Sequence, residues 1–234
     1  MQDKNQLDLI ISLFSNGKVQ EALDQINPLI KDNPNDAVLF NIRGACYAHI
    51  GEPIMAIKQY ETAIEIDSNY SEAFNNLGIT YHGLGDPEKA LANFEKAFSL
   101  KPDKVEIINV MISILNEMNN PNISIDYYQK IIKSSSELFI IHFNLGTAYQ
   151  ELDHIDDAID SYKKAINLNP EFADAFLNLG IIFEDSGKLD EAIKNLEKAN
   201  EIEPNNPSTC FNLGLILRDA GQADEAIKNF ERVI

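Results

Sequence analysis

The side chains that could catalyse a reaction or bind a metal ion are few and scattered in this sequence. Histidine and cysteine are common metal ligands and reactive groups, and the chain contains His49, His82, His142, His154, Cys46 and Cys210. No phosphate-binding loop, nucleophile elbow or His-Glu-x-x-His motif occurs around them. The sequence therefore predicts a chain without a catalytic constellation, a metal site or a cofactor.

Carboxylates could act as acids and bases, but their distribution is typical of a solvated surface. The chain has 37 Asp and Glu residues against 19 Lys and Arg residues, a net charge of −18. Many acidic residues lie at expected helix starts or alternate with lysine, as in Asp156-Asp157 and Glu197-Lys198. Phosphate groups are bound by clustered cations, and the only arginines are Arg43, Arg218 and Arg232. We therefore expect neither nucleic acid nor an anionic membrane as a partner.

The remaining global features favour a cytoplasmic protein. The sequence has no run of 18 apolar residues, so we expect no membrane span. Residues 1–6 lack the basic and apolar regions that begin a signal peptide. Two cysteines are too few for a disulfide framework, and we expect both to be free thiols.

A 34-residue repeat indicates which elements position these side chains. Gly44, Gly78, Gly146, Gly180 and Gly214 are separated by 34, 68, 34 and 34 residues. The chain divides, without insertion or deletion, into six complete repeats and one incomplete repeat. They span residues 3–36, 37–70, 71–104, 105–138, 139–172, 173–206 and 207–234. Positions are numbered 1 to 34 within each repeat below.

Each repeat has the pattern of two helices joined by a turn. Apolar residues at positions 4, 7 and 11, and again at 20, 24 and 27, recur at helical spacing. Position 15 in the turn is Gly17, Gly51, Gly85, Gly187 or Gly221. Proline at position 17 suits the first turn of the second helix, and proline at position 32 ends that helix. Small residues at positions 8, 20 and 27 predict close approach of the helices.

The third repeat shows the complete motif: Phe74-x-x-Leu77-Gly78-x-x-Tyr81, then Gly85, Ala90-x-x-x-Phe94, Ala97 and Pro102. This motif resembles that of the tetratricopeptide repeat (TPR) family. The resemblance covers essentially the whole chain. It implies an all-α fold, a right-handed α-solenoid of about seven helix-turn-helix units that forms a single superhelix over residues 1–234. It also implies that the first helix of each pair lines the inner wall.

Two repeats depart from the pattern. The first has Ile10 and Leu29 at positions 8 and 27, which we interpret as capping by a terminal repeat. The fourth has four departures, Ile112, Ser124, Ile131 and Ser136. Its two isoleucines predict a local change of superhelical pitch, with compensated packing as the equal alternative.

The resemblance implies that positions 2, 5, 6, 9, 12 and 13 face a groove. Position 6 is asparagine in four repeats: Asn76, Asn144, Asn178 and Asn212. The series resembles the asparagine ladder in the TPR superhelix of O-GlcNAc transferase. Amide side chains can both donate to and accept from a peptide backbone. The alternative is that each asparagine only reflects the repeat consensus.

Apolar residues at positions 5 and 9 predict an exposed strip along the same groove: Phe143, Leu177, Phe211, Ile181 and Leu215. The carboxylates of Glu151, Glu184 and Asp185 would flank it. Exposed apolar strips with a polar rim mark partner sites. We therefore expect a protein or peptide ligand, extended or helical, with apolar anchors and some positive charge. The groove lacks the cations that clamp an acidic chaperone tail.

The leading prediction is a non-catalytic scaffold for protein–protein interaction. One alternative is a substrate- or partner-recruiting arm of a larger transferase-type enzyme, with a catalytic domain beyond Ile234. Another is an assembly module that associates end to end, because the apolar stripe of the last helix has no following helix to cover it. The sequence does not identify the ligand.

Overall fold

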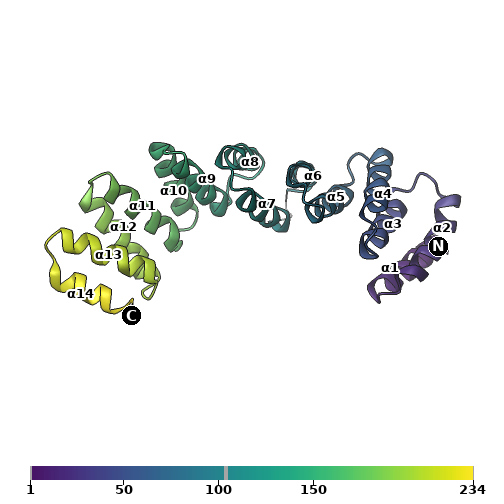
Figure 1. The fold of residues 1–234 in the computed structure, drawn as a ribbon. Helices are drawn as coiled ribbons and strands as arrows, with labels where there is room; N and C mark the ends of the chain where they lie inside the picture. Colours follow the sequence, from purple (N-terminus) through teal and green to yellow (C-terminus); the bar gives the residue numbers. More distant parts are fainter. Residues whose placement is uncertain (1, 103–104, 234) are drawn as a thin grey trace. The chain divides into compact units, whose positions relative to one another are not determined.

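Every secondary-structure element in the residues that the structure describes is an α-helix. The computed structural model describes the backbone of residues 2–102 and 105–233, which form fourteen α-helices (Figure 1). The chain divides into two compact units, an N-terminal unit of residues 1–118 and a C-terminal unit of residues 119–234. The all-α fold of repeated helix pairs is confirmed, whereas the single superhelix over 1–234 stays a prediction.

Seven helices form the N-terminal unit. They are α1 (Gln2–Ser15), α2 (Val19–Asp32), α3 (Ala37–His49), α4 (Pro53–Ile66), α5 (Ser71–Gly83), α6 (Pro87–Leu100) and α7 (Val105–Met118). Successive helices from α1 to α7 contact one another, and α3 also contacts α5. The first helices of the second and third repeats, α3 and α5, therefore lie against each other.

The C-terminal unit also contains seven helices. They are α8 (Pro121–Ser134), α9 (Phe139–Glu151), α10 (Ile155–Leu168), α11 (Ala173–Asp185), α12 (Leu189–Ile202), α13 (Pro207–Asp219) and α14 (Ala223–Glu231). Successive helices contact one another, and α11 also contacts α13. The boundary between the units falls inside the fourth repeat, whose sequence departs from the pattern. The predicted change of pitch there stays a prediction.

Proline and side-chain caps begin several helices. Pro53, Pro87 and Pro121 are the first residues of α4, α6 and α8, as predicted. The carboxylate of Asp86 accepts a hydrogen bond from the backbone N–H of Lys89, at 3.1 Å. This bond satisfies one of the N–H groups that a helix start leaves without a partner.

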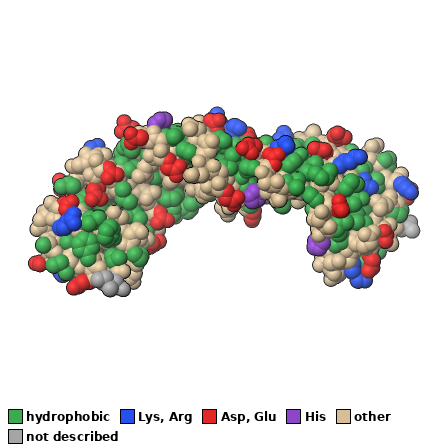
Figure 2. Space-filling view, viewed as in Figure 1, with side chains coloured by type: hydrophobic (Ala, Val, Ile, Leu, Met, Phe, Trp, Pro, Cys, Tyr) green, Lys and Arg blue, Asp and Glu red, His purple; other side chains and the backbone are tan. Residues whose placement is uncertain are grey.

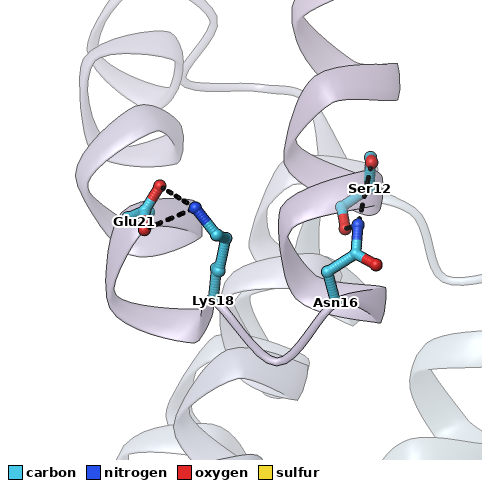
Figure 3. Close-up of polar contacts among 4 residues, drawn as sticks. All are labelled: Ser12, Asn16, Lys18 and Glu21. Carbon is cyan, nitrogen blue, oxygen red and sulfur yellow. Dashed lines mark hydrogen bonds and ion pairs between the residues drawn. The ribbon is translucent and has the colours of Figure 1, made fainter.

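The turn between α1 and α2 shows how exposed polar residues order a short connection (Figure 3). Asn16 Nδ2 donates to the carbonyl of Ser12 at 2.8 Å, at the end of α1. Lys18 pairs with Glu21 at 3.1 Å, at the start of α2. These contacts lie in the solvent, so they contribute only a few tenths of a kcal/mol, on the order of other exposed pairs.

The turn residue at position 15 adopts a left-handed backbone conformation throughout the described repeats. The five glycines there have φ between 72° and 79°. Asn119 and Asp153 occupy the same position in the fourth and fifth repeats, with φ of 47° and 60°. The turn geometry is therefore kept where glycine is absent, because asparagine and aspartate tolerate the left-handed region better than other residues.

Replacing Asp153 by glycine should stabilise the C-terminal unit. Glycine adopts positive φ without the steric penalty of a side chain, so the expected gain is about 0.5 kcal/mol. Urea unfolding followed by far-ultraviolet circular dichroism measures it. Alanine tolerates a positive φ less well than aspartate does, so Asp153→Ala should destabilise the C-terminal unit. If Asp153→Ala instead stabilised the unit, the positive φ at this position would not be a source of strain.

Glycine at position 8 allows the two helices of a repeat to pack closely. A Cβ atom built on Gly44, Gly146 or Gly214 would lie 2.5–2.8 Å from the ring of the residue at position 24. At Gly180 the corresponding contact is Leu196, at 2.6 Å. The predicted close approach is confirmed. In the first repeat Ile10 is fully buried and packs in one core cluster with Ile26 and Leu29.

Candidate functional site

Two of the three asparagines at position 6 of the C-terminal unit have similar surroundings. Asn144 Nδ2 donates to the carbonyl of Ile140 at 2.7 Å, and Asn212 Nδ2 donates to the carbonyl of Ser208 at 2.9 Å. Both bonds stay within the residue's own helix. Each side chain is partly exposed. These bonds identify which end of the amide is the nitrogen, because a carbonyl can only accept.

Asn178 donates to a different acceptor. Its Nδ2 lies 3.1 Å from the hydroxyl of Tyr162, which in turn donates to Gln150 Oε1 at 2.8 Å. The Oδ1 atoms of Asn144, Asn178 and Asn212 have no hydrogen-bond donor within the described residues. The three partly exposed side chains on α9, α11 and α13 therefore retain free acceptor oxygens.

Asn76 belongs to the N-terminal unit, whereas the other three asparagines belong to the C-terminal unit. Its Nδ2 donates to Asn41 Oδ1 at 3.0 Å, and Asn41 Nδ2 donates to the hydroxyl of Tyr70 at 3.3 Å. Asn41 is buried, so this chain of hydrogen bonds joins α5 to α3. Asn76 thus has an evident packing role, which sequence reasoning did not anticipate because Asn41 is 35 residues away.

The prediction of an exposed apolar strip is wrong for Leu177. Its side chain is only 9% exposed and packs in one cluster with Leu213 and Leu217 of α13. Because α11 contacts α13, the side chain at position 5 of α11 is enclosed by the next repeat. Ile181 packs partly buried against the same cluster.

The two phenylalanines of the strip differ from each other. Phe143 is partly buried, and its ring lies 4.9 Å from that of Phe172 and 5.6 Å from that of Tyr162. Phe211 on α13 is 48% exposed. Its ring centroid lies 6.1 Å from that of Phe230. Leu215 is partly buried. Phe211 is therefore the most exposed apolar residue of the predicted strip.

Acidic side chains gather at the C-terminal ends of α11 and α13. Burial raises the pKa of Glu184, and the neighbouring carboxylates of Asp185 and Asp219 raise it further. Arg218 opposes this effect and pairs with Asp219 at 2.8 Å. Glu151 of the predicted rim is exposed on α9. On the face drawn in Figure 2, carboxylates and apolar side chains are interspersed along the surface.

The N-terminal unit has an apolar pocket that sequence reasoning only partly indicated. The pocket has a volume of about 390 Å³ and is lined by Asn75, Ile79, Phe94, Glu106, Ile107 and Val110. Ile79 is 54% exposed. It occupies position 9, as Ile181 and Leu215 do, so the repeat register contained the signal that would have identified it.

Histidine and cysteine have structural surroundings. His142 is buried, as predicted, and its Nε2 lies 3.0 Å from the carbonyl of Ser136. His82 Nε2 lies 3.1 Å from a carboxylate oxygen of Glu117. Cys46 and Cys210 are buried free thiols, and burial raises the pKa of Cys46 to about 11. No three His, Cys, Asp or Glu residues within the described ranges are grouped to hold a metal ion.

Comparison with known proteins gives a consistent family assignment. A family pattern described as "Tetratricopeptide repeat" matches residues 37–103, and another with the same description matches 207–234. A third, described as "TPR repeat", matches residues 154–187 and 182–217. No curated protein matches the chain significantly.

Several solved structures share the fold. YrrB, described as a TPR protein with an unusual peptide-binding site, is 22% identical, with a TM-score of 0.57 over 79% of this chain and 95% of its own. The C-terminal part of a TPR repeat-containing protein from Cytophaga hutchinsonii is 21% identical. Its TM-score is 0.66 over 97% of this chain and 94% of its own.

A third structure extends well beyond this chain. The structure of Naa15/Naa10 bound to HypK-THB has a TM-score of 0.69 and 16% identity, over 99% of this chain and 36% of the matched one. At these identities the likeness concerns the fold alone. None of the helices within 2–102 and 105–233 combines the length and hydropathy that a bilayer span requires.

Proposed function

Because the chain belongs to the tetratricopeptide repeat family, we propose that it is a protein-interaction scaffold whose C-terminal unit binds a peptide segment of another protein. The observation that carries this proposal is the set of free amide oxygens on three successive first helices. They belong to Asn144, Asn178 and Asn212, whose nitrogens donate within the unit. The relative YrrB, which has a described peptide-binding site, supports the class of ligand.

The acceptor oxygens and negative charge of this surface favour a ligand that is rich in hydrogen-bond donors. Three amide oxygens accept hydrogen bonds, and Glu151, Glu184 and Asp185 add carboxylate acceptors. Peptide N–H groups and the side chains of lysine and arginine are the matching donors. Complementary charge increases the rate and specificity of association. A basic peptide segment is therefore the proposed ligand class.

Phe211 is the proposed apolar anchor. Nearly half of its surface is exposed, and Phe230 supports its ring from α14. Burying such an aromatic side chain at an interface contributes about 2 kcal/mol. Phe143 and Leu177 pack against core clusters of the unit, so neither is proposed as an anchor. The ligand should thus combine basic residues with at least one apolar side chain.

Replacing Asn144, Asn178 and Asn212 together by alanine should remove peptide binding while leaving the helical spectrum intact. Three lost hydrogen bonds correspond to about 100-fold weaker affinity. The probe is a peptide selected on the wild-type chain from a random dodecapeptide display library. Fluorescence anisotropy then gives the affinity of each variant.

Asn195→Ala is the matched control. Asn195 on α12 also donates to the carbonyl four residues earlier, at 2.7 Å, but it lies outside the proposed site. It should leave the affinity unchanged. Selected peptides that are predominantly acidic, or a triple variant with wild-type affinity, would refute the proposed site.

The recruiting arm of a transferase-type enzyme and end-to-end self-association stay predictions. Light scattering of the purified chain addresses the second, since association should raise the molecular mass with concentration. Ile227 on α14 is an exposed apolar residue at the surface concerned, and Ile227→Lys should then restore a monomer.

A further inference from the structure

Arg43 occupies a position that is apolar in the other repeats. It is residue 7 of the second repeat, on α3. The described structure buries the residue at position 7 in five other repeats: Leu77, Met111, Leu145, Leu179 and Leu213. Arginine at a core position requires its own set of polar contacts, because its guanidinium remains charged at any physiological pH.

Neutral groups hold the guanidinium in place. Arg43 Nε donates to Gln59 Oε1 at 2.7 Å, and Nη1 lies 3.4 Å from Asn27 Oδ1. The guanidinium carbon lies 5.1 Å from the ring centroid of Phe40. Gln59 is only 5% exposed, so it is itself fixed by packing. The side chain therefore extends from α3 toward the second helices α2 and α4, on which Asn27 and Gln59 lie.

The charge of Arg43 has no carboxylate partner within the described residues. Its side chain is half-buried, and burial lowers its pKa from the ordinary value. Arg218, by contrast, pairs directly with Asp219. A partly desolvated charge without a counterion is unfavourable, and it is unexpected in a chain with 37 carboxylates. The contacts of Arg43 thus orient a cation without neutralising it.

Donor capacity also remains on the guanidinium. Arginine has five N–H donors, and the two contacts with Gln59 and Asn27 use one on Nε and one on Nη1. Both N–H groups of Nη2 and one of Nη1 remain. Nη1 and Nη2 each keep at least one N–H, and these two nitrogens form the terminal edge through which a guanidinium can pair with a carboxylate.

We propose that Arg43, held by Gln59, Asn27 and Phe40, is a binding site for one carboxylate group of a partner protein. The planar carboxylate matches the free edge of the guanidinium and supplies the missing counterion. A dianion such as phosphate is less suited, because the site offers a single cation in a chain of net charge −18. The carboxylate comes from an acidic side chain or from a C-terminus. This inference does not depend on the proposed peptide site, which lies in the other unit.

Nuclear magnetic resonance of the arginine Nε–Hε groups tests the proposal in the whole chain. Only three such signals exist, and Arg218 and Arg232 serve as internal controls. The probes are acetyl-Gly-Asp-Gly-amide for a side-chain carboxylate, acetyl-Gly-Gly-Gly with a free C-terminus, and inorganic phosphate. We expect a saturable shift of the Arg43 signal with at least one carboxylate probe. The carboxylate probe that binds more tightly shows whether the carboxylate comes from a side chain or from a C-terminus.

Variants separate carboxylate binding from general attraction to charge. Arg43→Gln should weaken binding of the preferred carboxylate probe about tenfold or more, because a charge-assisted pair is lost. Binding to this variant is followed through the backbone signals of α3. Arg43→Lys keeps the charge but loses the planar edge, so it should also bind more weakly and lose selectivity over phosphate. The proposal fails if the three arginines shift in parallel, if phosphate binds as well as carboxylate, or if Arg43→Lys binds as the wild type does. Circular dichroism confirms that each variant is folded.

Discussion

Replacing Gly146 by alanine should lower the free energy of unfolding by about 2 kcal/mol, the usual cost of overpacking a core. The added Cβ would lie 2.8 Å from two atoms of the Tyr162 ring. That ring has no room to move, because Tyr162 is fully buried and its hydroxyl donates to Gln150 and accepts from Asn178. Urea unfolding followed by circular dichroism measures the loss.

Gly83 is the matched control for Gly146. It is also a helical glycine, at the end of α5, but a Cβ atom there would meet nothing within 4 Å. Gly83→Ala should therefore raise stability by about 0.5 kcal/mol, because alanine restricts the unfolded chain and favours a helix. The same chemical change should thus have opposite signs at the two positions. Equal effects would mean that close helix approach does not determine the residue at position 8.

The repeat register predicts much of the fold because it depends on local signals. Glycine at position 15, proline at position 17 and apolar residues at helical spacing each act within one repeat, so the helix boundaries follow from them. Asp153 is instructive, since its repeat lacks the turn glycine and keeps the left-handed turn. The register, rather than the glycine itself, was the reliable guide.

The candidate site was less predictable because exposure depends on the neighbouring repeat. Leu177 and Phe211 occupy the same position 5, yet α13 encloses Leu177 while Phe211 is about half exposed. The partners of Asn76 and Arg43 are likewise distant in sequence, at separations of 35 and 16 residues. A repeat pattern identifies the helix face of a residue, but the side chain that meets it comes from another helix.

Reversing two charges of the acidic patch should have the largest effect on ligand binding. Glu184, Asp185 and Asp219 lie close enough that the last two raise the pKa of the first. Asp185→Lys with Asp219→Lys would place two cations where a basic peptide is proposed to bind. Like charges at an interface cost several kcal/mol, so we expect affinity to fall about 100-fold or more. Fluorescence anisotropy with the peptide selected on the wild-type chain measures it.

The control for that variant carries the same total charge. Asp160 and Glu197 are exposed on α10 and α12, the second helices of their repeats. Asp160→Lys with Glu197→Lys changes the net charge by +4, from −18 to −14, as the patch variant does. This control variant should bind the peptide only slightly more weakly than the wild type does. Its small loss of affinity should disappear at high salt, because salt screens exposed charges. If both double variants lose affinity equally, the patch has no local role.

Lowering the pH should neutralise Glu184 of this patch without mutation. Burial is the main cause that raises the pKa of Glu184, so folding favours its protonated form. Its contribution to stability is fully present below the pKa of the unfolded chain and is lost as the pH rises through the higher folded pKa. Affinity for a basic peptide follows the opposite course. It should fall as the pH decreases through that raised pKa, and Glu184→Gln should remove this step. A wild-type affinity that is constant through the Glu184 titration would exclude this carboxylate from the binding surface.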